Sequence, residues 1–371
     1  MPVPLDEYPI HQAPVSMAYF ATSDRNVYDR CIFQIYDKSG ERQIISGLGV
    51  YPHLGVIDAY AVARKGTVQT VVRTSGALGS DRMDQAVGPY RIEVIEPLRS
   101  LRVTCEAPEL GLVLDVTFEG FSEATEEPRH NYMVDGKVVL DACRFVQTGT
   151  WTGTAVVNGE HWDIDPAGWV GARDRSWGIR PVGEPSAPGR PSSNPDYGMW
   201  WCWVPLKFDE YSIVVILQED AHGHRVLNEA VRLWPAASGK RPEQLGWPEV
   251  DITYRPGTRI PVGASIQLTE KGGKPLSLEV STRGGIPLAV GCGYGGDPDW
   301  SHGTWRGEKW LEGAVYDQLD PEVATRMGYG MIIDHVAHAT LNGDVGYGVF
   351  EHMLIGKHYP SGFDDWGTMA P

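Results

Sequence analysis

Hydrophobic and polar residues alternate along many short segments of the chain, and this pattern predicts β-strands. In the segment 112–119, Leu112, Leu114, Val116 and Phe118 occupy alternate positions with polar residues between most of them. Because successive side chains of a strand point to opposite faces, one face of this strand is predicted to be apolar and the other polar. Similar segments bounded by turn residues lie at 30–36, 44–50, 59–63, 68–74, 90–95, 101–107, 145–158, 198–205, 211–218 and 226–234.

Helical periodicity is scarce along the chain. The best candidate is 320–327, which begins with an Asp suited to cap a helix and a Pro suited to its first turn. Two long strand candidates follow at 329–341 and 345–355. The Asn-Gly-Asp sequence between them favours a hairpin, because Asn and Gly tolerate positive φ. We therefore predict an all-β protein with few short helices.

The chain is long enough for two domains. Its 371 residues correspond to about two domains of ordinary size, each with its own core. A pattern of strands with their own turns ends at 163–168, and a new pattern begins at Trp169. We therefore expect an N-terminal domain at 1–165 and a C-terminal domain at 166–371.

Charge and composition narrow the classes of partner. The formal net charge of -16 does not provide the cationic surface that binding to nucleic acid requires. The longest aliphatic run, 212–217, is too short to cross a bilayer, and residues 1–14 lack the pattern of a signal peptide. We expect a cytoplasmic protein with no nucleic-acid partner and no membrane-spanning segment.

Cysteine and histidine spacing does not favour a metal site. The five Cys residues are far apart, lack zinc-site spacing and are expected to be reduced. His335 and His338 share a predicted strand, where positions three apart point to opposite faces. The sequence also lacks a Walker A loop, a Gly-x-Ser-x-Gly elbow and a dinucleotide-binding glycine pattern. We therefore expect no metal and no cofactor.

The densest polar cluster surrounds Asp174, within residues 168–181. Arg173 and Arg175 flank this carboxylate and would keep it ionised at an exposed position. An apolar pocket would instead raise its pKa and suit it to donate a proton. We expect Trp177 to form a wall beside it and Arg173 to contact the substrate. The structural alternative is an ion-pair corner where two β units meet.

The segment Gly171-Ala-Arg-Asp-Arg-Ser-Trp-Gly178 resembles the short Asp-x-x-Trp-Gly signature of the AttH-like proteins, which include the carotenoid 1,2-hydratases. The length of the chain, its strand pattern and the place of this segment early in the second half are also similar. The resemblance implies two tandem lipocalin-like antiparallel β-barrel or sandwich domains. It further implies that Asp174 is an acid that protonates a carbon–carbon double bond. Hydratase segments usually carry His around this Asp, whereas Arg flanks it here.

A second cluster, at 291–310, combines Gly residues with aromatic side chains. Its glycines allow the backbone to turn closely around a ligand. Tyr294, Trp300 and Trp305 offer stacking surfaces for a substrate, and His302 supplies a titratable imidazole. We expect a pocket rim with His302 as a catalytic residue. A tight turn with aromatic packing is the alternative.

Further candidates lie on other predicted strands and turns. Trp201 and Trp203 share one face of the strand at 198–205, where they would contact an apolar substrate or fill a core. Tyr51 and His53 lie on a Pro-containing turn and are candidate substrate contacts, although a loop His is more often only solvated.

Glu351 lies on the C-terminal hairpin, on a face that it shares with Tyr347 and Val349. An inward carboxyl there would have a raised pKa and would serve as a third catalytic residue beside Asp174 and His302. An outward, solvated carboxylate is the alternative.

These residues favour an enzyme that binds a hydrophobic small molecule, such as an isoprenoid, polyketide or steroid-like compound. Proton transfer at a carbon–carbon double bond requires an acid, an aromatic wall that stabilises positive charge, and exclusion of water. We expect a lyase that hydrates or dehydrates its substrate, or an isomerase. The position of Asp174 just after the expected domain boundary favours a pocket between the domains over one inside a barrel.

Other functions stay open at this point. A pericyclic cyclase is another activity that the resemblance implies. A non-catalytic lipid or small-molecule binding protein would need an apolar cavity with few titratable groups. Carbohydrate processing would need two facing carboxylates about 5–10 Å apart in an open cleft. The sequence also leaves open whether the chain forms a homodimer.

Overall fold

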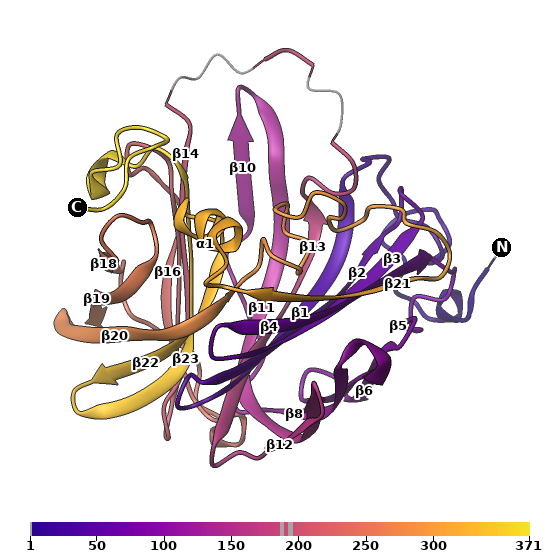
Figure 1. The fold of residues 1–371 in the computed structure, drawn as a ribbon, viewed down its shortest axis with the longest axis horizontal. Helices are drawn as coiled ribbons and strands as arrows, with labels where there is room; N and C mark the ends of the chain where they lie inside the picture. The colour runs from indigo at the N-terminus through magenta and orange to yellow at the C-terminus, as the bar shows by residue number, and fades with distance from the viewer. Residues whose placement is uncertain (1, 186–188, 192–195) are drawn as a thin grey trace.

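The computed structural model describes residues 2–185, 189–191 and 196–371, and it consists of two antiparallel β-sheets that lie side by side (Figure 1). The described helical segments are short: α1 (Pro321–Gly328), η1 (Pro4–Glu7), η2 (Pro108–Leu110), η3 (Ala236–Ser238) and η4 (Tyr359–Ser361). None of the helices in these residues is long and apolar enough to span a membrane. The predicted all-β class with two tandem antiparallel units and few short helices is confirmed.

The first sheet is strongly curled and contains the strands of the N-terminal half. Its order is β21-β4-β3-β2-β1-β13-β11-β8-β7-β6-β5, and β9, β10 and β12 also pair with β11. The strands are β1 (Val27–Asp37), β2 (Arg42–Tyr51), β3 (Val56–Lys65), β4 (Val68–Ala77), β5 (Ala86–Val87), β6 (Tyr90–Glu96), β7 (Ser100–Ala107), β8 (Leu112–Gly120), β9 (Thr125–Glu126), β10 (His130–Val134), β11 (Lys137–Val157), β12 (Glu160–Ile164), β13 (Trp169–Ile179) and β21 (Trp310–Asp317).

The second sheet contains most strands of the C-terminal half. Its order is β17-β16-β15-β14-β23-β22-β20-β19-β18. The strands are β14 (Gly198–Lys207), β15 (Ser212–Glu219), β16 (Arg225–Leu233), β17 (Glu243–Gln244), β18 (Glu249–Tyr254), β19 (Pro261–Glu270), β20 (Lys274–Pro287), β22 (Ile333–Leu341) and β23 (Asp344–Gly356).

Two strands that follow residue 165 belong to the first sheet. β13 lies between β1 and β11, and β21 pairs with β4 at the edge of the same sheet. The chain therefore changes from the first sheet to the second between β13 and β14, and it returns once at β21. The division into domains at 1–165 and 166–371 stays a prediction.

The alternation in the sequence corresponds to the burial in the structure. On β8, Leu112, Leu114, Val116 and Phe118 are all buried in the core of the curled first sheet. β22 and β23 form the expected hairpin, in which Asn342 adopts a positive φ of 52°. The strand and turn chemistry of the sequence thus accounts for these elements.

A third core joins the two sheets. It combines side chains of the first sheet with side chains of the second, namely Tyr36, Val146, Val170, Trp201, Trp203, Val214, Ile216, Leu227, Val231, Leu233, Val336 and Val349. Trp200 and Cys202 point the other way, into the core of the second sheet. The face of β14 that carries Trp201 and Trp203 therefore packs against the face of β13 that carries Val170, and this junction positions the candidate site.

Candidate functional site

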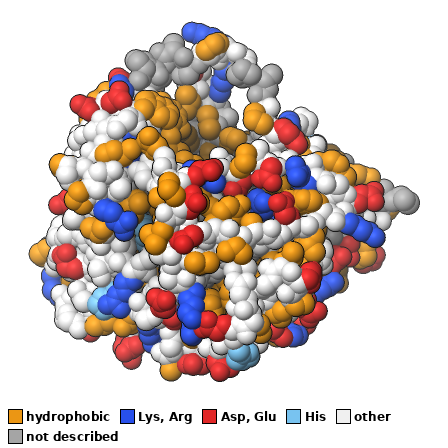
Figure 2. Space-filling view, in the orientation of Figure 1, with side chains coloured by type: hydrophobic (Ala, Val, Ile, Leu, Met, Phe, Trp, Pro, Cys, Tyr) orange, Lys and Arg blue, Asp and Glu red, His pale blue; other side chains and the backbone are white. Residues whose placement is uncertain are grey.

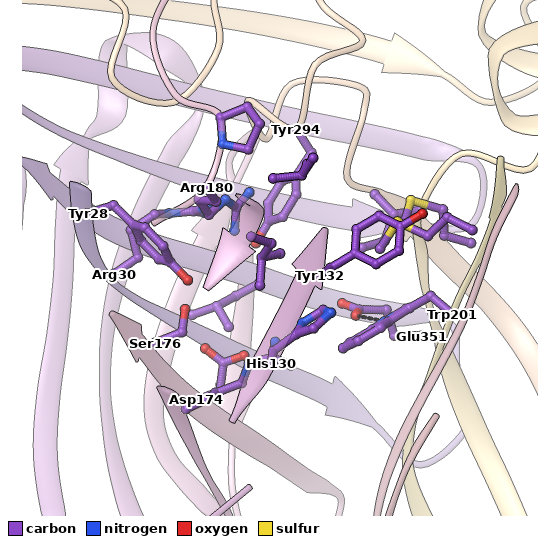
Figure 3. A pocket seen from close by; sticks show the side chains of 18 of the residues that line it. Tyr28, Arg30, His130, Tyr132, Asp174, Ser176, Arg180, Trp201, Tyr294 and Glu351 are labelled. Atoms are coloured by element: carbon purple, nitrogen blue, oxygen red, sulfur yellow. Dashed lines mark hydrogen bonds between the residues drawn. The ribbon is translucent and has the colours of Figure 1, made fainter. Parts of the chain in front are cut away.

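A cavity of about 290 Å³ lies between the two sheets. Its wall is formed by β1, β10, β11 and β13 of the first sheet and by β14 and β23 of the second. Figure 2 shows a hollow with hydrophobic side chains around it near the top of the view, and Figure 3 shows the side chains that line the cavity. Met199, Met331, Ile332 and Met353 are among them. Such a cavity suits a largely apolar molecule that meets a few polar groups.

Asp174 faces this cavity from β13. Its partners on the adjacent strands are Ile32 of β1 and Val146 of β11, so apolar side chains flank the carboxyl. Burial raises the pKa of Asp174 to about 7, although the positive charge of Arg144 opposes this shift. The carboxyl can therefore hold and release a proton near neutral pH.

Ser176, two positions further along β13, lies between two arginines. Its partners are Arg30 of β1 and Arg144 of β11. Arg144 Nη1 lies 3.3 Å from Glu127 Oε2, and the guanidinium lies 5.1 Å from the ring centre of Trp201. The charge of Arg144 is therefore balanced within the protein.

A second carboxyl faces the cavity from β23. Glu351 Oε1 accepts a hydrogen bond of 2.5 Å from Trp201 Nε1 (Figure 3). Asp334 is its partner on β22, and Gln34 Nε2 donates to Asp334 Oδ2 at 3.2 Å. Burial and the neighbouring Glu351 hold the pKa of Asp334 well above its ordinary value. The carboxyl of Asp334 therefore holds its proton more tightly than an exposed Asp does.

Arg30 and Arg180 form a cationic part of the wall with two tyrosines. Arg30 Nη2 donates to His302 Nε2 at 3.1 Å, and its guanidinium lies 4.9 Å from the ring centre of Tyr294. Arg180 lies 5.4 Å from the ring centre of Tyr28 and 5.5 Å from that of Tyr294. Burial and the two arginines lower the pKa of His302 well below its ordinary value, so the imidazole is neutral.

His130 of β10 covers another part of the cavity. Its ring stacks on Trp201, with ring centres 5.8 Å apart and planes 13° apart. Burial, with a contribution from Arg144, lowers the pKa of His130 to about 4, so this imidazole is neutral at pH 7. His130 thus extends the aromatic surface that Trp201 offers to a ligand.

Four predicted site residues line the cavity: Asp174, Glu351, Trp201 and Tyr294. They come from β13, β23, β14 and the loop before β21, so the fold brings together positions that are far apart in the sequence. In the described part of the chain, no group of three or more His, Cys, Asp or Glu side chains is placed to hold a metal ion. The grouped side chains can bind an apolar molecule and exchange protons with it.

The expectation that Trp177 forms a wall beside Asp174 is wrong, because the two side chains lie on opposite faces of β13. Odd spacing along a strand reverses the face, so Arg173 and Trp177 lie on the face of β13 that is turned away from Asp174. Arg173 Nε donates to Gln147 Oε1 at 2.9 Å, and its guanidinium lies over Phe145. Trp177 is 39% exposed and outside the cavity lining.

The aromatic cluster at 291–310 reaches the cavity through Tyr294. His302 is buried behind Tyr294, with ring centres 4.7 Å apart, and does not belong to the cavity lining. Trp300 is buried against Trp310. Trp305 is 45% exposed and also lies outside the lining. His302 therefore contacts the wall of the cavity rather than its interior.

The remaining candidates also lie outside the cavity lining. Tyr51 is buried and donates to Asp58 Oδ1 at 3.1 Å. His53 is exposed and hydrogen-bonds to a backbone carbonyl. Trp203 shares its face of β14 with Trp201, as the alternation predicts, but it is buried and donates to Glu127 Oε1 at 2.6 Å.

Several residues that line the cavity were not predicted from the sequence. Ser176 carries a usable signal, because its spacing of two from Asp174 places both on one face. Arg30, Arg144 and His130 carry no local signal, because they reach the cavity only through the pairing of β1, β10 and β11 in the first sheet.

Comparison with known proteins places the chain in a family and a fold. A family model with the description "Family of unknown function (DUF8625)" matches residues 3–364. No curated protein matches the sequence. An AttH-like protein from Nitrosomonas europaea is 12% identical with a TM-score of 0.53, and the match covers 93% of this chain and 98% of that one.

Kievitone hydratase from Nectria haematococca is 14% identical with a TM-score of 0.51, and the match covers 91% of this chain and 90% of that one. At these identities the two structures show a shared fold, so the resemblance suggested by residues 171–178 is confirmed at that level. The chain therefore belongs to the family of unknown function DUF8625, and its fold is that of the AttH-like proteins.

Proposed function

We propose that this chain is an enzyme that moves a proton to or from carbon, at a carbon–carbon double bond of a hydrophobic small molecule held between the two sheets. The position of Asp174 carries the proposal. Its carboxyl faces the cavity between Ile32 and Val146, and burial raises its pKa to about 7. A general acid or base works best when its pKa lies close to the working pH.

The other cavity residues support the same chemistry. Behind Glu351, burial raises the pKa of Asp334, so this carboxyl holds a proton next to the cavity wall. Trp201, Tyr294 and the apolar lining bury the substrate and exclude water around the reacting carbon. Hydration, dehydration and isomerisation of the double bond all fit this arrangement, and one protein with the same fold is named a hydratase.

Proton transfer to carbon can be measured directly in D2O. The probes are α-ionone and α-ionol, two isoprenoids with the same carbon skeleton that carry a carbonyl and a hydroxyl group, respectively. Mass spectrometry follows uptake of deuterium or of water into each probe. We expect turnover of at least one probe, and a rate loss of about 100-fold or more in Asp174→Asn, because general acid–base catalysis typically contributes about 10²–10⁴-fold.

Asp58→Asn is the matched control for this experiment. Asp58 also has a pKa raised to about 7 by burial, but it bonds to Tyr51 and Gly303 outside the cavity lining and acts on Arg30 and Arg180 only through its charge. This variant should retain turnover. If neither probe shows turnover that depends on Asp174 and one of them still binds tightly, the result would instead favour a non-catalytic binding protein.

A further inference from the structure

The cavity wall contains a buried guanidinium whose charge the protein does not balance by direct contact. Arg30 is 4% exposed, and its Nη2 donates to the neutral ring of His302. Its Nη1 has no hydrogen-bond partner among the described residues. The carboxyl of Asp58 acts on this charge but makes no ion pair with it, so the guanidinium can still contact a ligand that brings negative charge to Arg30.

Arg180 brings a second guanidinium to the same place. The ring of Tyr294 lies within cation–π distance of both Arg30 and Arg180. Figure 3 shows these three side chains and Tyr28 grouped together, with Trp201 and Glu351 on the other side of the view. The third arginine of the lining, Arg144, differs because Glu127 is paired with it. Arg30 and Arg180 therefore lie together without an ion pair in the described residues, and Asp58 is a carboxyl that acts on both without contact.

This charge determines which kind of intermediate the cavity stabilises. Protonation of an isolated double bond creates a carbocation, which two nearby guanidinium groups repel. Removal of a proton beside a conjugated carbonyl creates an enolate, whose oxygen such groups attract. The charges around Arg30 therefore favour the anionic route over the cationic one.

The strand register sets the spacing between the cation and the proton carrier. Arg30 is the direct partner of Ser176, so it is diagonal to Asp174 on the same face of the first sheet. Diagonal neighbours on adjacent antiparallel strands are typically about 7–8 Å apart. A conjugated carbonyl that meets a hydrogen bond at its oxygen and a carboxyl at its carbon fits between two such side chains.

We infer that the substrate is a conjugated enone whose oxygen is held by Arg30 and Arg180 while Asp174 moves a proton on its carbon chain. This inference rests on the proposed function and narrows its substrate class. Arg30 and Arg180 act here as specificity-determining residues.

The step balances without a further reactant. The carboxylate of Asp174 takes a proton from the carbon γ to the carbonyl, and the C–H electron pair forms a new carbon–carbon double bond. The original double bond shifts toward the carbonyl, whose π pair moves onto oxygen and gives a dienolate. The carboxyl of Asp174 then returns the proton to the α carbon, so that the double bond has moved and no atom is gained or lost.

A pair of naphthalenes tests the oxygen site by binding alone. The hydroxyl of 2-naphthol mimics an enol, and 2-methoxynaphthalene has the same rings without an ionisable group. We expect the protein to bind 2-naphthol about tenfold or more tightly than 2-methoxynaphthalene, because a hydrogen bond to a charged group is worth about 1.5–3 kcal/mol. Bound 2-naphthol should also ionise at a lower pH than free 2-naphthol, which its absorption spectrum reports.

Both effects should disappear in Arg30→Met and weaken in Arg180→Met, which removes the more exposed of the two cations. Arg64→Met is the control for loss of a buried arginine, since Arg64 is bonded to the carbonyls of Gly40 and Gly66 away from the cavity. Equal binding of the two naphthalenes by the wild type, or the same preference in Arg30→Met, would overturn the inference.

The deuterium experiment separates this inference from the proposed function. Both proposals would be supported if deuterium exchanges into α-ionone but not into α-ionol, and if this exchange depends on both Asp174 and Arg30. Asp174-dependent turnover of α-ionol at a rate similar to that of α-ionone would retain the proposed function and contradict the enone assignment. Turnover of neither probe would contradict the proposed function, and the naphthalene preference would still test the oxygen site.

Discussion

Two buried arginines of the first sheet, Arg73 on β4 and Arg30 on β1, have opposite electrostatic surroundings. Arg73 has three carboxylates within 4 Å: Glu312 at 3.2 Å, Asp299 at 3.7 Å and Asp297 at 3.8 Å. Arg30 donates to the neutral ring of His302 and takes part in none of the ion pairs of the described residues, although the charge of Asp58 acts on it from a greater distance. The first guanidinium is in direct contact with carboxylates, whereas the second has no such contact in the described residues and lines the cavity.

The aromatic surroundings of the two arginines do not distinguish them. Arg73 lies 5.7 Å from the ring centres of Trp300 and Trp310, and Arg30 lies 4.9 Å from that of Tyr294. The two arginines differ because Arg73 has carboxylates in contact with it, whereas Arg30 lines a cavity. A charged side chain among aromatic rings is therefore a candidate for ligand binding only where it lines a cavity and has no ion-pair partner in the protein.

Arg73→Met should have the largest effect on stability. It removes the cation shared by Glu312, Asp299 and the buried Asp297, of which only Asp297 keeps another ion pair in the described residues, with Arg326 at 3.1 Å. It also removes the cation–π contacts with Trp300 and Trp310, and loss of one partner of a buried ion pair costs about 3–5 kcal/mol. Chemical denaturation measures the free energy of unfolding. A loss below about 1 kcal/mol would mean that the ion pairs around Arg73 do not hold the first sheet together.

Asp174→Asn should stabilise the protein above pH 7. The folded-state pKa of about 7 exceeds the ordinary value of 3.8, so the folded protein binds this proton more tightly and loses stability as the pH rises between these values. The variant lacks this titration and should gain up to about 4 kcal/mol at pH 8, and little at pH 4. Denaturation curves of both proteins at pH 4, 6 and 8 test this. A constant difference across the three pH values would contradict the raised pKa.

Arg30→Met should change the free energy of unfolding by less than about 1 kcal/mol. The substitution removes one hydrogen bond to a neutral ring, and it also removes a buried charge that makes no ion pair, so the two effects oppose each other. Chemical denaturation of Arg30→Met and Arg73→Met under the same conditions compares the two free energies of unfolding. A loss as large as that of Arg73→Met would show that the charge of Arg30 is balanced in the fold after all.

Trp177→Phe should have the smallest effect on the cavity. Its ring lies on the opposite face of β13 from Asp174, so binding of 2-naphthol should stay within about twofold of the wild type. Trp201→Phe should weaken binding, because it removes the donor to Glu351 and part of the cavity wall. Fluorescence titration compares the two variants, and equal losses would place Trp177 nearer the ligand than its strand position allows.

The fold could be predicted from the sequence because its signals are local. Alternation along β8 and the Asn-Gly-Asp turn between β22 and β23 depend on neighbouring residues alone. Because side chains two positions apart share a face of a strand, the alternation also puts Trp201 and Trp203 on one face of β14. Applied strictly to β13, it would also have separated Trp177 from Asp174 and added Ser176 to the cavity.

The rest of the site depends on contacts between distant segments. Arg30 meets the cavity because β1 pairs with β13 in one register, and Glu351 meets it because the second sheet packs against the first. The sequence pattern does not specify either contact. The pattern also predicted that the cluster at 291–310 forms the rim of the pocket. In the structure Tyr294 lines the cavity, whereas Trp300 packs beside Arg73.

The most direct test of the central claim is a titration of the Asp174 carboxyl itself. Protein labelled with ¹³C at the Asp carboxyl carbons is followed by NMR across pH, and the spectrum of Asp174→Asn identifies the resonance. We expect a midpoint near pH 7, because burial beside the cavity raises the pKa of this carboxyl. A midpoint near its ordinary value of 3.8 would contradict it, because Asp174 would then be fully ionised at neutral pH and unable to donate a proton.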